Sequence, residues 1–137
     1  CHYLPEGYAA MARQLFPLMN KHNYDAESKE SVTAPNIQSV SYASARKDKI
    51  TLVFDQKVKW DDKVAGRFYF DDDSAELTAV SGIERTITLK LAGPSTAKTL
   101  TYIKGGKWKQ DDTIIRGANN IAALTFCEVP IRPAKSR

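Results

Sequence analysis

The sequence predicts a mainly β fold, an antiparallel β-sandwich of the immunoglobulin or fibronectin type III kind with about seven strands, preceded by one N-terminal amphipathic helix. From residue 36 onward, short segments rich in β-branched and aromatic residues alternate between apolar and polar positions. Turn residues separate most of these segments at spacings of about 8 to 12 residues. No stretch among them has a helical period long enough to form an α/β unit. These three observations favour a sandwich.

The first element expected is a helix that ends near Asn23. Pro5 suits a first helical turn because the N–H that proline lacks would have been unpaired there, and Glu6 places negative charge at the positive end of the helix dipole. Pro17 is expected to kink or divide the helix. The apolar residues recur at steps of three and four, which is one face of a helix: they are Tyr8, Met11, Ala12, Leu15, Leu18 and Met19.

The apolar period then changes from 3.6 to 2, which we take as a domain boundary. Residues 24–35 are polar and without a period, as in a linker, and the sandwich is expected over residues 36–131 with a tail at 132–137. The clearest strand is 49–54, in which Ile50, Leu52 and Phe54 share one face. The expected strands are residues 37–42, 49–54, 67–70, 76–80, 86–91, 99–103 and 121–127.

The beginning of the chain resembles a known catalytic motif. His2 stands just before the predicted helix, which begins with Glu6-Gly7-Tyr8. This arrangement is similar to the last motif of the SGNH (GDSL-type) hydrolases, Asp-x-x-His followed by a short loop and an amphipathic helix. The resemblance implies that His2 is the catalytic histidine and that residues 1–23 are a remnant of the hydrolase domain. The family's aspartate would fall two positions before Cys1, and its serine and oxyanion-hole residues lie far upstream.

Residues 116–131 resemble the closing strand of the β-rich C-terminal region of sialate O-acetylesterases and related carbohydrate esterases. Together, the two resemblances imply the C-terminal part of a serine esterase that removes acetyl groups from sugars, without a cofactor. Such a chain would be inactive alone, and its partner would be the rest of the catalytic domain, upstream or as a separate chain. The resemblance also implies a secreted or periplasmic location.

A second hypothesis needs no hydrolysis. The sandwich would then be a carbohydrate-binding or protein-interaction module, with exposed aromatic side chains as its contact surface. Trp60, Tyr69 and Trp108 are the candidate binding residues. Alternatively, both tryptophans have a structural role and cover the core with their apolar rings. A third hypothesis makes the sandwich a structural spacer. Sandwich folds host all three roles.

Charge and composition argue against two partner classes. The net charge is +4, but the basic residues are scattered and interleaved with acidic ones, so no nucleic-acid partner is expected. No apolar run approaches the length of about 20 residues that crosses a bilayer, so no membrane partner is expected either. Asp71, Asp72 and Asp73 lack the glycine and terminal glutamate of an EF-hand and are expected to form a turn, with no metal site.

The two cysteines leave alternatives open. Cys127 falls within an apolar run and is expected to be a small buried hydrophobe. A disulfide between Cys1 and Cys127 is the other outcome that the sequence allows.

Overall fold

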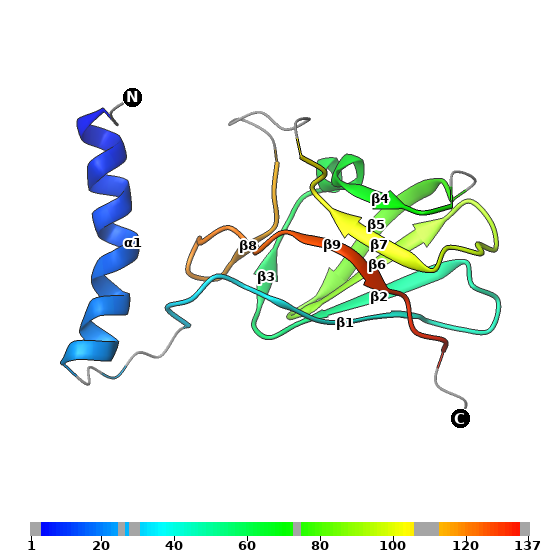
Figure 1. The fold of residues 1–137 in the computed structure, drawn as a ribbon, viewed down its shortest axis with the longest axis horizontal. Helices are drawn as coiled ribbons and strands as arrows, with labels where there is room; N and C mark the ends of the chain where they lie inside the picture. Colours follow the sequence, from blue (N-terminus) through cyan, green and yellow to red (C-terminus); the bar gives the residue numbers. More distant parts are fainter. Residues whose placement is uncertain (1–3, 25–26, 28–30, 73–74, 106–112, 135–137) are drawn as a thin grey trace.

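The computed structural model describes residues 4–24, 27, 31–72, 75–105 and 113–134 (Figure 1). These residues form one α-helix, one 3₁₀ helix and nine strands, so the fold is mainly β, as predicted. In chain order the elements are α1 (Pro5–Asn23), β1 (Ile37–Tyr42), β2 (Lys49–Phe54), β3 (Val58–Lys59), η1 (Asp62–Arg67), β4 (Phe68–Phe70), β5 (Leu77–Ile83), β6 (Thr86–Leu91), β7 (Thr99–Tyr102), β8 (Arg116–Gly117) and β9 (Phe126–Pro130).

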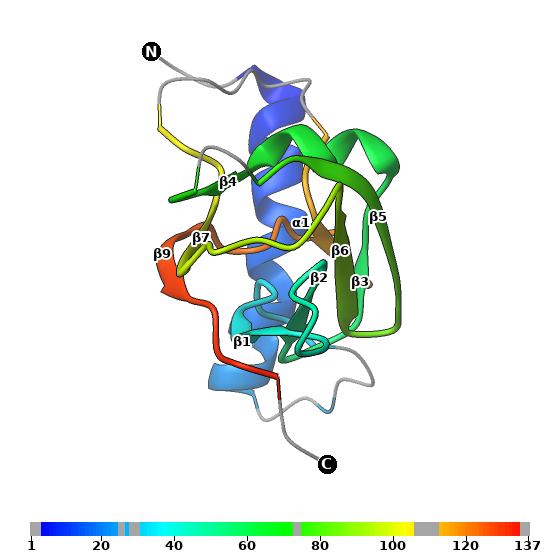
Figure 2. The same cartoon turned by 90° about the vertical axis from the view of Figure 1, so that its right-hand side faces the viewer.

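The strands form three antiparallel sheets. One has four strands in the order β1-β2-β6-β5, the second has three in the order β4-β7-β9, and the third is the short pair β3-β8. In the largest sheet, Leu89 of β6 lies between Ile50 of β2 and Val80 of β5. Figures 1 and 2 show β4, β7 and β9 on one side of the molecule and the larger sheet on the other, which is the sandwich arrangement.

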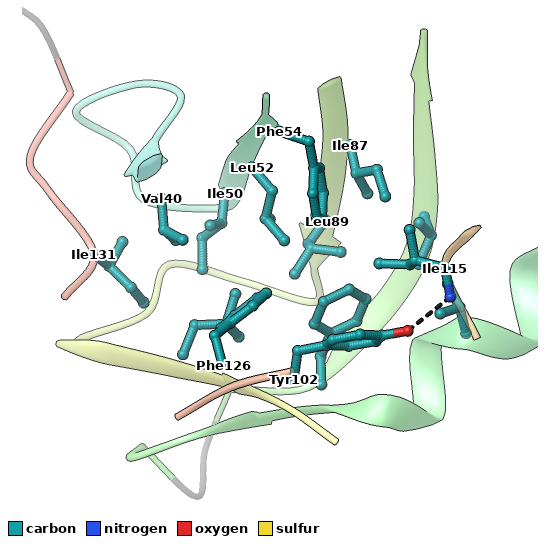
Figure 3. Packing of buried hydrophobic residues seen from close by; sticks show 14 of the residues in the cluster. Val40, Ile50, Leu52, Phe54, Ile87, Leu89, Tyr102, Ile115, Phe126 and Ile131 are labelled. Carbon is teal, nitrogen blue, oxygen red and sulfur yellow. Dashed lines mark hydrogen bonds between the residues drawn. The ribbon is translucent and has the colours of Figure 1, made fainter. Parts of the chain in front are cut away.

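The core lies between the two larger sheets (Figure 3). The period of two in β2 turns Ile50, Leu52 and Phe54 inward and leaves each of them fully buried, so the predicted core face of this strand is confirmed. The three-stranded sheet contributes Tyr102, whose ring packs 5.3 Å from that of Phe68 and 5.6 Å from that of Phe126, measured between centroids.

The end of the chain differs from its prediction. The last strand begins at Phe126, not at residue 121, because the preceding residues form other backbone hydrogen bonds. The amide of Ala123 donates to Ile115 O, and that of Leu124 donates to Pro35 O. The pair β3-β8 and the 3₁₀ helix were not predicted, since two-residue strands have no alternation to detect.

Hydrogen bonds also extend past both expected ends of the sandwich. Val32 is buried, and the Asn119 side chain donates to the carbonyl oxygens of Ser31 and Thr33. At the other end, Arg132 pairs with β1: its amide donates to Val40 O at 3.0 Å. The ordered sandwich thus includes part of the expected linker and the first residue of the expected tail.

Candidate functional site

The helix α1 stands to one side of the sandwich, near β8 (Figure 1), and lies behind it in the view of Figure 2. It is one unbroken helix, so Pro17 does not divide it, and Pro5 and Glu6 lie in its first turn as predicted. No residue of α1 is buried. The apolar side chains that form one face of this helix are therefore exposed in this structure.

The side of α1 that faces the sandwich is not its apolar side. A groove of about 500 Å³ separates the two, and the helix lines it with Ala10, Arg13, Gln14 and Pro17, which recur at steps of three and four. The apolar residues lie on the opposite side of the helix. Tyr8, Met11, Leu15 and Met19 are between 39% and 53% exposed. The sandwich thus faces the more polar side of α1 across the groove and buries none of it.

His2 lies outside the described residues, as do Cys1 and Trp108. The described chain begins at Leu4, whose extended backbone leads into α1 and whose carbonyl accepts the amide of Gly7 at 2.8 Å. By sequence, His2 is two residues ahead of Leu4. The role of His2 as a catalytic histidine stays a prediction.

Trp60 follows β3 directly and lies between the core and a surface groove. It is partly buried and packs against the core cluster, as expected of an amphipathic cover. Its ring also lies near Gly82 of β5, where an added Cβ would be 3.0 Å from the Trp60 Cη2 atom. Glycine is required at this position chiefly because an added Cβ would clash with the Thr86 carbonyl oxygen of the neighbouring strand. The same side chain lines a groove of about 330 Å³, beside Lys59, Asp61, Thr113, Ile114, Arg116 and Asn120.

Hydrogen bonds hold the polar groups of the Trp60 groove. Asp61 caps η1, because its Oδ1 accepts the amide of Lys63 at 2.8 Å, and its Oδ2 accepts the Thr113 hydroxyl at 3.3 Å. Arg116 Nη1 donates to Asn120 O at 3.1 Å, and Lys59 Nζ donates to a backbone carbonyl at 3.4 Å. The antiparallel pair β3-β8 thus places two cationic side chains, Lys59 and Arg116, in the groove.

Tyr69 does not join this groove. It is half-buried in β4, at the edge of the three-stranded sheet, and pairs with Thr101 of β7. The structure therefore keeps Trp60 and Tyr69 apart. Sequence reasoning found Trp60 but missed Arg116 and Lys59, since they meet only through the pairing of two strands that are distant in the chain.

The acidic run beginning at Asp71 holds a turn in place. Asp71 Oδ1 accepts the amides of Lys98 and Thr99 at 2.8 and 2.9 Å, and Asp72 Oδ2 accepts the amide and the hydroxyl of Thr96. The hydrogen bond from the Thr99 amide, with that from Lys98, lowers the pKa of the Asp71 carboxyl. Within the described residues, no group of three or more histidine, cysteine or acidic side chains is placed to hold a metal ion.

Cys127 is exposed, so its expected burial is wrong. The reason is the alternation of β9, which turns Phe126 into the core and its neighbour outward. The Cys127 thiol is free and accepts the Thr101 hydroxyl at 3.9 Å.

Fold and site together define an antiparallel β-sandwich with an amphipathic helix whose apolar face is uncovered and with a groove beside a tryptophan. Comparison of the chain with protein-family models, with curated proteins and with solved structures finds no match. No helix among the described residues is both long and apolar enough to span a membrane.

Proposed function

We propose that this chain is the C-terminal part of an SGNH-type carbohydrate esterase, to which it contributes the catalytic histidine, His2, and an accessory sandwich. The observation that supports the proposal is the uncovered apolar face of α1. The resemblance of the segment from His2 to Tyr8 to the last motif of that family supplies the chemistry.

The helix needs a covering surface. Most helical stability in proteins comes from packing of an apolar face, and Pro17 inside this 19-residue helix lowers the stability that the helix has alone. The sandwich does not provide that packing, because the helix turns Ala10, Arg13, Gln14 and Pro17 toward it. In the resembled fold, the last helix lies against the sheet of the catalytic domain. The same contact would cover Tyr8, Met11, Leu15 and Met19 here.

In the proposed reaction, His2 removes the proton from a serine hydroxyl of the catalytic domain while the serine oxygen attacks the acetyl carbonyl. The imidazolium then gives this proton to the departing sugar oxygen. In the second half, His2 takes a proton from water, whose oxygen attacks the acetyl-enzyme. Acetate leaves as the serine recovers its proton. An aspartate holds the other ring nitrogen of His2 throughout.

The test is ester hydrolysis by the polypeptide that includes the upstream coding sequence. With p-nitrophenyl acetate as substrate, His2→Ala should lower kcat by about a thousandfold or more. His22, the other histidine of the chain, lies in the last turn of α1 and provides the matched control: His22→Ala should leave kcat unchanged. Full activity of the His2→Ala variant would overturn the proposal, as would turnover by the 137 residues alone.

A further inference from the structure

We propose that the groove beside Trp60 binds one sugar ring that carries a carboxylate, as in a polysaccharide of hexuronic acids. This inference does not rest on the proposed hydrolysis, because every group that it uses lies in the sandwich. The volume of about 330 Å³ is within the range of small-molecule sites.

The aromatic side of the site is Trp60. Trp60 packs against the core cluster and lies next to Gly82 of β5, which places its ring at the edge of the groove. Among the described residues, none accepts a hydrogen bond from the indole N–H of Trp60. A fixed aromatic ring with an unused donor suits a sugar, whose C–H face stacks on the ring and whose hydroxyls accept from the donor.

The charged side of the site is the pair β3-β8. Lys59 and Arg116 are direct partners in this antiparallel pair. Like charges directly opposite each other destabilise a sheet. The β3-β8 sheet has only two residue pairs, and Lys59 and Arg116 are one of them. A ligand carboxylate between them would relieve that repulsion and would accept hydrogen bonds from both side chains.

The remaining polar groups favour the same ligand. Asp61 already accepts hydrogen bonds from the Lys63 amide and the Thr113 hydroxyl, so its oxygens are engaged. Among the described residues, the Arg116 side chain donates one hydrogen bond, to Asn120 O, and its other N–H groups have no acceptor. The exposed Asn120 side chain adds an amide at the rim of the groove. Within the part of the chain that the structure describes, the groove is therefore rich in donors and has two cations, Lys59 and Arg116, against one carboxylate, Asp61.

A nucleic-acid strand is the competing ligand, since its bases also stack on aromatic rings. Such binding relies on a cationic path along several phosphates. Here Asp61 and Asp62 follow Trp60 directly, which interrupts such a path. The geometry therefore favours one acidic ring over a polyanion backbone.

The test uses the full 137-residue chain and two-dimensional ¹H–¹⁵N NMR. The chain has two tryptophans, so the indole signal that persists in a Trp108→Phe variant belongs to Trp60. Titration with pentagalacturonate should shift this signal and those of Arg116 and Asn120. Neutral maltopentaose should bind at least about tenfold more weakly, because it lacks the charge-assisted hydrogen bonds.

Variants separate the parts of the site. Arg116→Gln should weaken pentagalacturonate binding about tenfold, whereas Arg132→Gln, an exposed arginine outside the groove, should have no effect. Asn120→Gly should weaken it about threefold, and glycine accepts the φ of 63° found there. Each variant must keep the signal dispersion of the parent chain.

Three results would overturn the inference. The first is the absence of any shift at Trp60 with pentagalacturonate. The second is equal affinity for maltopentaose or for a decathymidylate strand. The third is an Arg116→Gln variant that is folded and binds as the parent does.

Discussion

Replacement of Tyr102 by phenylalanine tests the packing at the centre of the sandwich. Tyr102 and Ile115 are both fully buried, and the Tyr102 hydroxyl oxygen accepts the Ile115 amide at 2.7 Å (Figure 3). Phenylalanine keeps the ring in place between Phe68 and Phe126 but leaves this amide without an acceptor. A buried polar group without a partner costs about 1 to 3 kcal/mol, so Tyr102→Phe should lower the free energy of unfolding by that amount.

Urea unfolding followed by circular dichroism measures this loss at neutral pH. The matched control is Tyr69→Phe, which makes the same chemical change at a half-buried hydroxyl on the sheet edge. Its effect should stay within about 0.5 kcal/mol. Equal stability of the Tyr102→Phe variant and the parent would refute the view that this buried hydrogen bond stabilises the core.

Alkaline pH provides an independent reading of the same hydroxyl. Burial raises the pKa of Tyr102 to about 12, from an ordinary value of 10.0. Between these values the unfolded chain releases the proton and the folded chain keeps it, so stability falls as pH rises. The slope from one proton is at most about 1.4 kcal/mol per pH unit. Tyr102→Phe should lack this component, and identical alkaline slopes in the two proteins would contradict the burial argument.

Three further predictions concern the core, the acidic turn and the helix. Leu89→Ala should cost about 2 to 5 kcal/mol in urea unfolding, because Leu89 is fully buried between two strands; a cost under 1 kcal/mol would contradict its central place. The lowered pKa of Asp71 means that its stabilising contribution is present above its ordinary pKa and is lost as pH falls through the folded value. A carbon-detected NMR titration of Asp71 that gives an ordinary or raised pKa would refute this. Leu15→Glu should change the unfolding free energy of the isolated chain by less than about 0.5 kcal/mol, since α1 buries nothing; a larger loss would reveal packing on the sandwich.

Alternation was enough to predict the central strands. In β1, β2 and β6 the predicted residues and the observed bounds coincide. Every second residue is buried in β2 and β6, and Val40 and Tyr42 are buried in β1. The end of the chain was harder. Apolar residues 121–127 suggested one strand, but the chain there makes separate hydrogen bonds to Ile115 and Pro35 before it joins β7. Such hydrogen bonds between residues distant in the chain leave no periodic signal in the sequence.

The candidate groove could be predicted only in part. Trp60 is conspicuous as one of two tryptophans, and its place next to charged residues suggested a surface position. Its neighbours Arg116 and Asn120 come from a segment more than 50 residues later, which only tertiary pairing brings to β3. The helix face was predicted as an apolar stripe. The apolar stripe points away from the sandwich. The spacing of apolar residues in the sequence does not specify this orientation, because it depends on tertiary packing.

The most direct measurement of the proposed function is the coding sequence upstream of Cys1. The account predicts an aspartate two residues before Cys1, which would complete the Asp-x-x-His motif with His2, and a Gly-Asp-Ser block much farther upstream. It also predicts that the helix stripe of Tyr8, Met11, Leu15 and Met19 becomes protected from hydrogen exchange in that longer polypeptide. An upstream sequence with neither the aspartate nor the serine block would contradict the esterase proposal and leave the sandwich as a binding module.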